Sequence, residues 1–188
     1  TLGTGFGGGL VTGGDLYIGD NAAATEIWCT RGKLQPDRIA EEGVSIRAVK
    51  RVYAQEVGIP FEEAPEPKEI YEIGMGERDG NKAAALEAFR RMGESVGDAL
   101  ADANTLVDGL LVIGGGLSGA SRLFLPEVVA EMNRPYPHGE VPRTSMKAFN
   151  LEDGADRELF LKGEKRTIPV PGTDKTVAYD PLMRTGVG

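Results

Sequence analysis

Two clusters of glycine constrain this chain more than any other feature of its sequence. Five of the seven residues at positions 3–9 are glycine, and residues 114–116 are three glycines in succession. The chain holds 27 glycines in 188 residues, about twice the usual share. Because glycine has no Cβ, such segments make tight turns and let a ligand approach the main chain. We therefore expect a tight turn at each cluster. Consecutive free N–H groups in the first would form an anion-binding nest.

The first cluster satisfies the bare pattern Gly-x-Gly-x-x-Gly over residues 3–8. As a dinucleotide fingerprint this pattern must open a helix, whereas the apolar runs on either side of Gly13 and Gly14 predict a β-hairpin. The chain contains no Gly-x-x-x-x-Gly-Lys-Ser/Thr loop, and neither the His-Arg-Asp nor the Asp-Phe-Gly tripeptide of protein kinases. Phosphate binding is the favoured interpretation of the cluster, and a purely structural hairpin is the alternative.

The second cluster follows a short apolar run at 109–114 and precedes a helical pattern at 120–132. A buried strand that ends in glycines and opens a helix is where open α/β sheets bind ligands. Two such clusters about a hundred residues apart suggest two walls of one nucleotide cleft in an α/β fold. Other expected elements are helices over 45–57 and 81–106, irregular chain over 20–43, a surface connection over 60–79, a strand over 147–151 and a hairpin of 166–170 with 176–179.

Charge and cysteine content exclude several classes of protein. Lys and Arg number 21 against 29 Asp and Glu, a net charge of −8, which argues against nucleic acid or an anionic membrane as the main partner. The single cysteine, Cys29, excludes an internal disulfide, and we expect it to pack as a small buried apolar group. No apolar run approaches the ~18–20 residues that span a bilayer, and no signal peptide is recognised. We therefore expect a cytoplasmic protein, with His138 in a loop.

These motifs resemble the ROK (repressor, ORF, kinase) family of sugar kinases. Residues 1–9 resemble the family's Leu-Gly-Thr-Gly-x-Gly-Gly-Gly loop, and residues 16–27 resemble the Gly-Ala-Asn-Gly-Ala-Ala-Gly-Glu-x-Gly-His segment that follows it. Residues 44–48 resemble the Ser-x-x-Ala helix start, and residues 111–118 the late adenosine-side strand and turn. The resemblance covers residues 1 to about 133 in the family's order.

The resemblance implies an actin-like ATPase (ribonuclease H-like) fold, with two lobes that each place helices around a mixed sheet. Residues 1–188 then correspond to the C-terminal lobe only, with 134–185 as a possible subgroup-specific insertion. The N-terminal lobe's Asp-x-Gly-Gly-Thr loop and its Asn-Asp-x-Asn-Ala segment, which carries the catalytic Asp, are both missing from this sequence. Residues 20–24 imitate the second motif, but they follow the glycine loop, so we assign no catalytic residue in this chain.

The resemblance also implies the ligands. The activity would be transfer of the ATP γ-phosphoryl group to a sugar hydroxyl, with Mg²⁺ bridging the phosphates, and the isolated chain would be inactive. Sugar and ATP are the expected partners, with no membrane, no nucleic acid through this lobe, and a possible homodimer. The implied contacts are Gly3, Thr4, Gly5, Gly7 and Gly8 with the phosphates, Gly114, Gly115 and Gly116 on the adenosine side, and Glu26 and Glu41 with the sugar. A solvated surface carboxylate is the alternative for either glutamate.

The sequence departs from the family at the end of the second motif. Trp28 and Cys29 replace the Gly-His pair, and no cysteine run follows. Zinc is therefore not expected, because one Cys and the distant His138 do not make a tetrahedral site. The loss of the His also removes a sugar contact implied by the resemblance. The loss of this contact and of the zinc site favours an alternative to the sugar kinase, namely a non-catalytic sugar-sensing or transcriptional-repressor member of the same family. A third interpretation is a domain whose glycine loops are purely structural.

Overall fold

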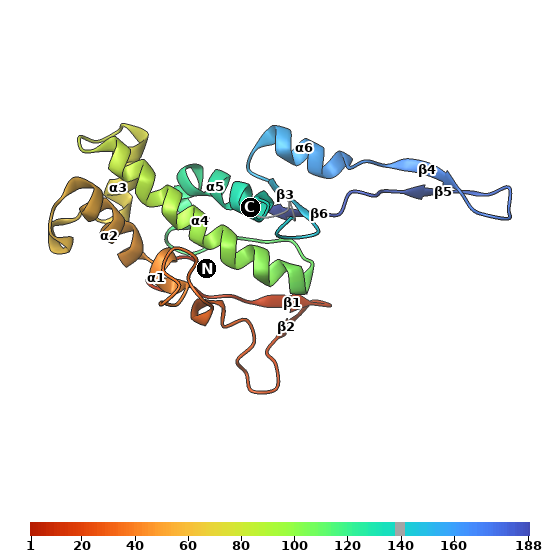
Figure 1. Cartoon of the computed structure of the whole chain (residues 1–188), viewed down its shortest axis with the longest axis horizontal. Coiled ribbons are helices and arrows are strands. Elements are labelled where there is room, and N and C mark those ends of the chain that lie inside the picture. Colours follow the sequence, from red (N-terminus) through yellow and green to blue (C-terminus); the bar gives the residue numbers. More distant parts are fainter. Residues whose placement is uncertain (138–141) are drawn as a thin grey trace.

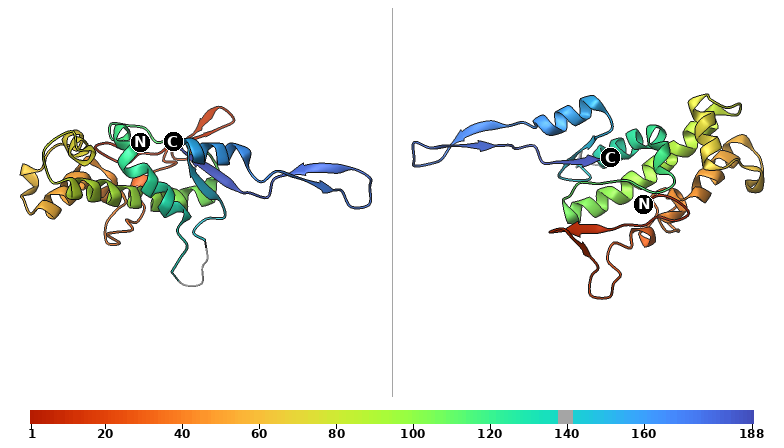
Figure 2. Two further views of the ribbon diagram at one scale, coloured as in Figure 1. Left: turned by 90° about the horizontal axis from the view of Figure 1, so that it is seen from above. Right: turned by 180° about the vertical axis from the view of Figure 1, so that it is seen from behind.

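The structure is a computed structural model that describes residues 1–137 and 142–188 (Figure 1). A body of helices surrounds the long helix α4, and a thin two-stranded arm extends from one end (Figures 1 and 2). The elements in chain order are β1 (Leu10–Thr12), β2 (Asp15–Tyr17), α1 (Glu41–Val44), α2 (Ile46–Val57), α3 (Pro67–Met75), α4 (Lys82–Val107), α5 (Ser121–Asn133), β3 (Lys147–Asn150), α6 (Gly154–Lys162), β4 (Arg166–Pro169), β5 (Thr176–Tyr179) and β6 (Arg184–Val187), with short 3₁₀ turns at Ile27–Cys29, Phe61–Glu63 and Ser118–Ala120.

Helix α4 is the centre of the core, and it confirms the helix expected over 81–106. Asn81 caps its start, where the side-chain oxygen accepts a hydrogen bond from the Ala84 N–H at 3.0 Å. Its apolar side chains recur at helical spacing, so Phe89 and Val96 are fully buried against α2, α3 and α5. Helix α2 likewise confirms the helix expected after Ser45.

The crossing of α4 with α5 is unusually close because two glycines lie on the facing side of α4. A Cβ on Gly93 would lie 2.6 Å from the carbonyl oxygen of Phe124, and one on Gly97 would lie 2.6 Å from that of Val128. Real Cβ atoms do not approach a carbonyl so closely, so a side chain at either position would push the two helices apart. The backbone of α5 therefore rests directly on α4.

Over the residues that the structure describes, three two-stranded sheets are distributed around this body. Strands β1 and β2 form the expected hairpin, joined by Gly13 and Gly14, both with positive φ, as a two-residue hairpin turn requires. Strands β3 and β6 pair in parallel, and Leu111 adds one parallel bridge to Val187. The strand expected over 109–114 is thus reduced to a single bridge. Strands β4 and β5 are antiparallel and confirm the late hairpin, which forms the projecting arm (Figures 1 and 2).

Other segments differ from expectation. The connection expected over 60–79 contains a 3₁₀ turn and helix α3, which begins with a capping box between Glu66 and Glu69. The prolines and glutamates of this stretch predict a surface connection, but Ile70 and Ile73 turn inward and are buried. The sequence pattern did not predict helix α6 or strand β6. The position of His138 lies outside the described residues.

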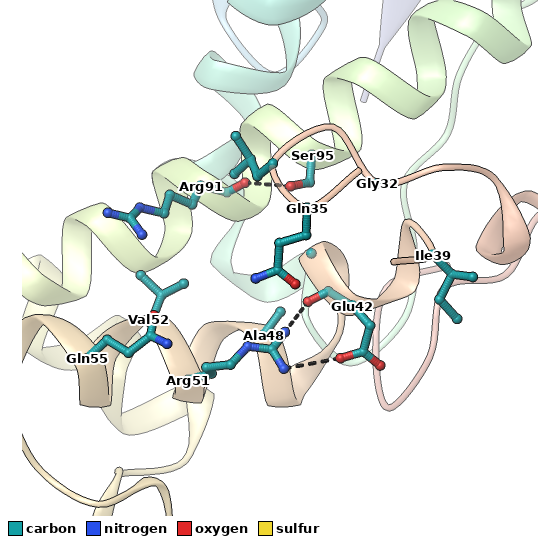
Figure 3. A pocket seen from close by; sticks show the side chains of 12 residues that line it. Gly32, Gln35, Ile39, Glu42, Ala48, Arg51, Val52, Gln55, Arg91 and Ser95 are labelled. Atoms are coloured by element: carbon teal, nitrogen blue, oxygen red, sulfur yellow. Dashed lines mark hydrogen bonds and ion pairs between the residues drawn. The ribbon is translucent and has the colours of Figure 1, made fainter. Parts of the chain in front are cut away.

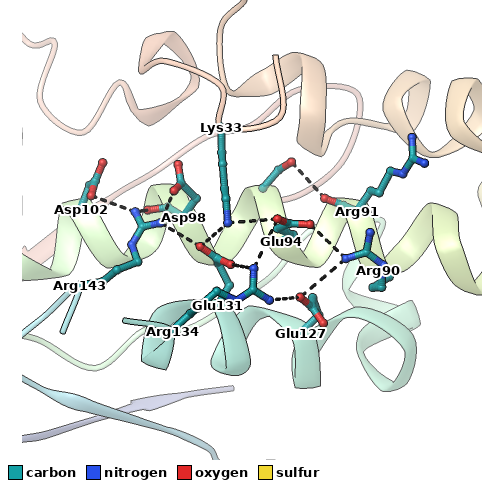
Figure 4. A network of polar contacts seen from close by, with 11 residues as sticks. Lys33, Arg90, Arg91, Glu94, Asp98, Asp102, Glu127, Glu131, Arg134 and Arg143 are labelled. Carbon is teal, nitrogen blue, oxygen red and sulfur yellow. Dashed lines mark hydrogen bonds and ion pairs between the residues drawn. The ribbon is translucent and has the colours of Figure 1, made fainter. Parts of the chain in front are cut away.

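A network of ion pairs holds α4, α5 and two loops together (Figure 4). Its centre is the fully buried carboxylate of Glu131 on α5. Lys33 approaches this carboxylate to 2.6 Å, Arg143 to 2.8 Å and Arg134 to 2.5 Å. Lys33 also contacts Glu94 of α4 at 3.0 Å. A buried charge is tolerated only with such partners, so the network fixes how the loop around Lys33 and the segment at Arg143 lie on the two helices.

Candidate functional site

The two glycine clusters meet in space. The N–H of Leu2 donates to the carbonyl of Gly114 at 2.7 Å, and the N–H of Leu117 donates to the carbonyl of Leu2 at 3.0 Å. Beside these bonds lies a pocket of about 440 Å³, lined by residues 1–7, Glu41, Gly115 and Gly116. The two turns that the sequence analysis singled out therefore form walls of one pocket, as the two-wall interpretation requires.

Three glycines of the pocket wall, Gly5, Gly7 and Gly115, leave no room for a Cβ as the structure stands. Gly115 has φ +99°, and a Cβ there would lie 2.5 Å from the Leu2 carbonyl oxygen. A Cβ on Gly5 would lie 2.7 Å from Oε2 of Glu41, and one on Gly7 would lie 2.9 Å from Oγ1 of Thr1. Gly115 is thus required by close approach as well as by its positive φ. Because five of the ten residues that line the pocket are glycines, main-chain N–H and C=O groups make up much of its surface.

Glu41 is the charged group on the pocket wall. Its Oε2 accepts a hydrogen bond from the Phe6 N–H at 3.1 Å, and its Oε1 accepts one from Arg47 at 2.8 Å. Arg47 also donates to the Thr4 carbonyl at 3.1 Å, so the pair braces the glycine loop against α1 and α2. The hydrogen bond from Arg47, and then that from Phe6, holds the pKa of the Glu41 carboxyl below its usual value. The carboxylate is therefore ionised at neutral pH and faces the pocket with free lone pairs.

The start of α2 also contacts the glycine loop. The N–H of Ile46, in the first turn of α2, donates to the Gly3 carbonyl at 2.8 Å. Ser45 occupies the N-cap position, as expected, but its side chain makes no capping hydrogen bond and its hydroxyl is buried without a partner in the described part of the chain. The glycine loop therefore satisfies one of the N–H groups that open α2.

Some of the predicted binding residues line the pocket and others do not. Gly3, Thr4, Gly5, Gly7, Gly115, Gly116 and Glu41 line the pocket. Gly114 lies behind it and holds Leu2 through its carbonyl, while Gly8 faces a neighbouring groove. Glu26 is exposed, does not line the pocket, and accepts a hydrogen bond from the indole N–H of Trp28. Thus this structure does not bring the two predicted sugar-binding glutamates together on one pocket wall.

A second cavity lies between α1, α2, α4 and the loop at 32–39 (Figure 3). Its volume is about 100 Å³, well below the ~300–1,000 Å³ of typical ligand pockets. Arg51 is anchored beside it by Glu42 at 3.1 Å, and the Ser95 hydroxyl donates to the Arg91 carbonyl at 3.0 Å. Oε1 of Gln35 is buried there without a hydrogen-bond partner in the described part of the chain. The small volume leaves room for solvent only.

Cys29 corrects one expectation, because it is exposed rather than buried. It lies at the end of a 3₁₀ turn on the surface, where its thiol donates to the Glu26 carbonyl at 3.0 Å. Within residues 1–137 and 142–188, no group of three or more His, Cys, Asp or Glu side chains is arranged to hold a metal ion. Over the same residues, none of the helices has both the length and the apolar run needed to cross a bilayer.

A glycine-lined pocket between the loop at residues 1–7 and the turn at 115–116, set in an α/β scaffold, is the arrangement of one lobe of an actin-like ATPase, and the solved structures below have this fold. The comparisons give the family: residues 1–155 match the model of the ROK family, and the chain belongs to that family. No match is found among curated proteins.

Solved structures give the same result. The chain is 49% identical to a glucokinase from Parabacteroides distasonis, with a TM-score of 0.89 over 99% of this chain and 50% of that one. It is 26% identical to a ROK family glucokinase from Streptomyces griseus in complex with glucose and AMPPNP, with a TM-score of 0.60 over 72% of this chain and 51% of that one. The chain therefore spans about half the length of these relatives.

Proposed function

We propose that this chain is the C-terminal lobe of an ATP-dependent sugar kinase, and that its glycine-lined pocket holds the phosphates of ATP and borders the sugar. The observation that carries the proposal is the pocket itself, in which residues 1–7 and 115–116 present main chain to a space of about 440 Å³. That volume lies within the range of ligand pockets. The relatives named glucokinase, one of them holding glucose and AMPPNP, support the same reaction class.

The residues present fit a phosphate group. Within the described chain, the N–H groups of Thr4 and Gly5 have no main-chain partner, so both are free to donate to an anion. A Cβ at Gly5 would lie 2.7 Å from Oε2 of Glu41, so a side chain there would disturb the pocket wall next to these donors. ATP would supply the transferred γ-phosphoryl group, with Mg²⁺ neutralising its charge. The chain's own contribution would be to orient the phosphates with main-chain donors.

Glu41 fits the sugar side of the same pocket. Arg47 and Phe6 fix its carboxylate in place, and each oxygen keeps a lone pair that can accept a hydroxyl proton. A fixed carboxylate orients a hydroxyl group with little loss of side-chain entropy on binding. Glu26 would join it only after a movement of the segment around residues 25–29. We therefore propose Glu41, rather than Glu26, as the main sugar contact of this lobe.

Calorimetric titration with Mg²⁺·AMPPNP tests the proposal. Gly5→Ala places a methyl group on the pocket wall, and we expect it to weaken nucleotide binding at least ten-fold. Gly154→Ala is the matched control, because a Cβ there meets no atom within 4 Å and the position lies outside the pocket. Equal affinities for the two variants, both folded by circular dichroism, would contradict the proposed phosphate site.

The isolated chain should not phosphorylate sugar, because the other lobe supplies the catalytic Asp in the family that the sequence resembles. ATP-dependent phosphorylation of glucose by the purified chain above a protein-free blank would refute this expectation. We also propose that the parent protein acts in the cytoplasm and pairs as a homodimer.

One observation favours a second function, a sugar-sensing or repressor member of the family. Trp28 occupies the position expected for glycine, and its indole engages the Glu26 carboxylate on the surface. If sugar binding is intact in the full-length protein but phosphoryl transfer is absent, this second function is the correct one.

A further inference from the structure

The arm formed by β4 and β5 projects away from the helical body (Figures 1 and 2). Within the described residues, these two strands pair with each other and with no further strand. Every residue of β5 is exposed, including Val177 at 49% and Tyr179 at 46%. An isolated two-stranded hairpin is marginally stable at best in water, and three or more strands are usually needed for an independent sheet. We therefore expect the arm to add further strands.

The root of the arm is fixed to the body through Asp180, directly after β5. Its Oδ2 accepts a hydrogen bond from Arg184 at 2.6 Å, and its Oδ1 accepts hydrogen bonds from the N–H groups of Glu164 and Leu182, both at 3.1 Å. Arg184 is the first residue of β6, which pairs with β3 in the body. The direction of the arm is thus set before any partner binds, which lowers the entropic cost of association.

The outer edge of β5 presents free main-chain groups. The N–H of Val170 donates to the carbonyl of Lys175 at 2.9 Å, so the main-chain groups of this pair lie between the two strands. These groups alternate in direction along a strand, so those of Thr176 and Ala178 point away from β4. In the described part of the chain, no main-chain group bonds to them on that side. This edge is therefore able to accept another strand.

The outer edge of β4 is different. Its outward-facing positions are Thr167 and Pro169, which lie opposite Ala178 and Thr176 of β5. Proline has no N–H to donate, and a second proline, Pro171, follows two residues later. Prolines on an edge strand prevent the addition of a further strand. A strand that joins the arm must therefore pair with β5.

The sequence of β5 suits an antiparallel copy of itself. With Ala178 opposite Ala178 of a second copy, the two residues exchange two hydrogen bonds, and Val177 lies opposite Tyr179 on either side. Aromatic and β-branched side chains stabilise each other across neighbouring strands. On the same face of the arm, Ile168 is paired with Val177, and the Arg166 guanidinium lies 5.7 Å from the ring centre of Tyr179. The row Arg166, Tyr179, Val177, Ile168 then runs across all four strands.

The two neighbouring registers fit less well. A centre at Val177 places Asp174 opposite Asp180 of the second copy, and like charges directly opposite each other destabilise a sheet. A centre at Tyr179 places Val177 opposite Pro181, beyond the end of β5. The register centred on Ala178 sets no like charges opposite each other, so pairing and charge favour the same arrangement.

We propose that the arm is a dimer contact, and that its occupant is a second copy of this chain, added antiparallel at β5 with Ala178 at the two-fold axis. The product is a four-stranded sheet in the order β4–β5–β5–β4. Both outer edges are then β4, whose Pro169 accepts no further strand, so the assembly closes at two copies. This inference rests on the homodimer proposed above and assigns its contact surface, which lies beyond the residues 1–155 that match the family.

Sedimentation velocity over a range of chain concentrations tests the contact. Four-residue strands make a small interface, so we expect a dissociation constant on the order of 10 µM. Ala178→Pro removes the outward N–H of β5 and should weaken self-association at least ten-fold. Thr167→Pro is the matched control, because Thr167 lies directly opposite Ala178 and its N–H points to the outer edge of β4. That variant should change the constant less than two-fold.

Disulfide formation gives a second readout that needs no proline. In a Cys29→Ser background, Ala178→Cys should form a covalent dimer under mild oxidation, because residues directly opposite at such an axis have Cα atoms about 5.5 Å apart. Thr167→Cys, in the same background, places the thiol on the outer edge of β4 and should give no covalent dimer.

The outcomes separate this contact from the homodimer itself. A chain that stays monomeric at about 300 µM, thirty-fold above the expected constant, would overturn both for this lobe. A dimer that the two proline variants weaken equally, or that neither weakens, would overturn the β5 contact and leave a homodimer through another surface. Equal covalent linkage through residues 167 and 178 would also overturn it. These readouts need no nucleotide, so they stand apart from the test of the phosphate site.

Discussion

Replacing Gly115 with alanine is the most direct probe of the contact between the two glycine turns. Gly115 has φ +99°, a conformation that alanine adopts only at a cost of roughly 1–2 kcal/mol. The new Cβ would also lie 2.5 Å from the Leu2 carbonyl oxygen and 2.8 Å from the Leu2 nitrogen. Both are main-chain atoms held by hydrogen bonds to Gly114 and Leu117, so they do not swing aside as a flexible side chain would.

Forcing extra volume into such a contact costs about 1–3 kcal/mol. Together with the backbone term this destabilises the chain by about 2–5 kcal/mol, and with a urea m-value near 2 kcal/mol/M the midpoint falls by about 1–2.5 M. Gly116→Ala is the matched control, because a Cβ at Gly116 meets nothing within 4 Å and its φ is not in the left-handed region. We expect that variant to lie within about 0.5 kcal/mol of the parent chain.

Urea denaturation followed by circular dichroism at 222 nm measures both variants. Equal m-values would show that only stability has changed. If Gly115→Ala and Gly116→Ala unfold at the same urea concentration, the close approach of Leu2 to residue 115 is not a feature of the folded chain. The conclusion that the two glycine turns form walls of one pocket would then be wrong.

Three further substitutions test the core and the charges. Gly97→Ala should cost about 1–3 kcal/mol in thermal unfolding by separating α4 from α5; an unchanged Tm would contradict the close crossing. Glu131→Gln should cost about 3 kcal/mol in urea unfolding, because it leaves the surrounding cations without their buried partner, whereas Glu158→Gln on the exposed face of α6 should cost almost nothing. The hydrogen bond from Arg90 lowers the pKa of Glu87 to about 2, against 4.5 when unpaired, so this pair stabilises the fold above pH 4.5 and the benefit is lost as the pH falls toward 2. Glu87→Gln should therefore flatten the fall in urea midpoint over that range, and an unchanged slope would exclude the pair as its source.

The elements that were predictable from the sequence are those whose patterns are local. Helix α4 follows from apolar spacing and from Asn81 at its start, and the hairpin of β1 and β2 follows from Gly13 and Gly14. The meeting of the two glycine clusters was also predictable, because consecutive glycines in an α/β pattern have few uses other than close approach. These signals need no knowledge of what packs against them.

The features that were missed depend on tertiary partners. Gly97 looks like a weakness within a helix until α5 is placed against it. Glu131 looks like a surface residue, and only the arrival of Lys33 and Arg143 from distant segments allows its burial. Cys29 was expected inside because cysteine usually is, but the neighbouring turn exposes it. The Glu26 carboxylate lies outside the pocket for the same reason, since the fold of residues 25–29 is set by contacts rather than by the motif.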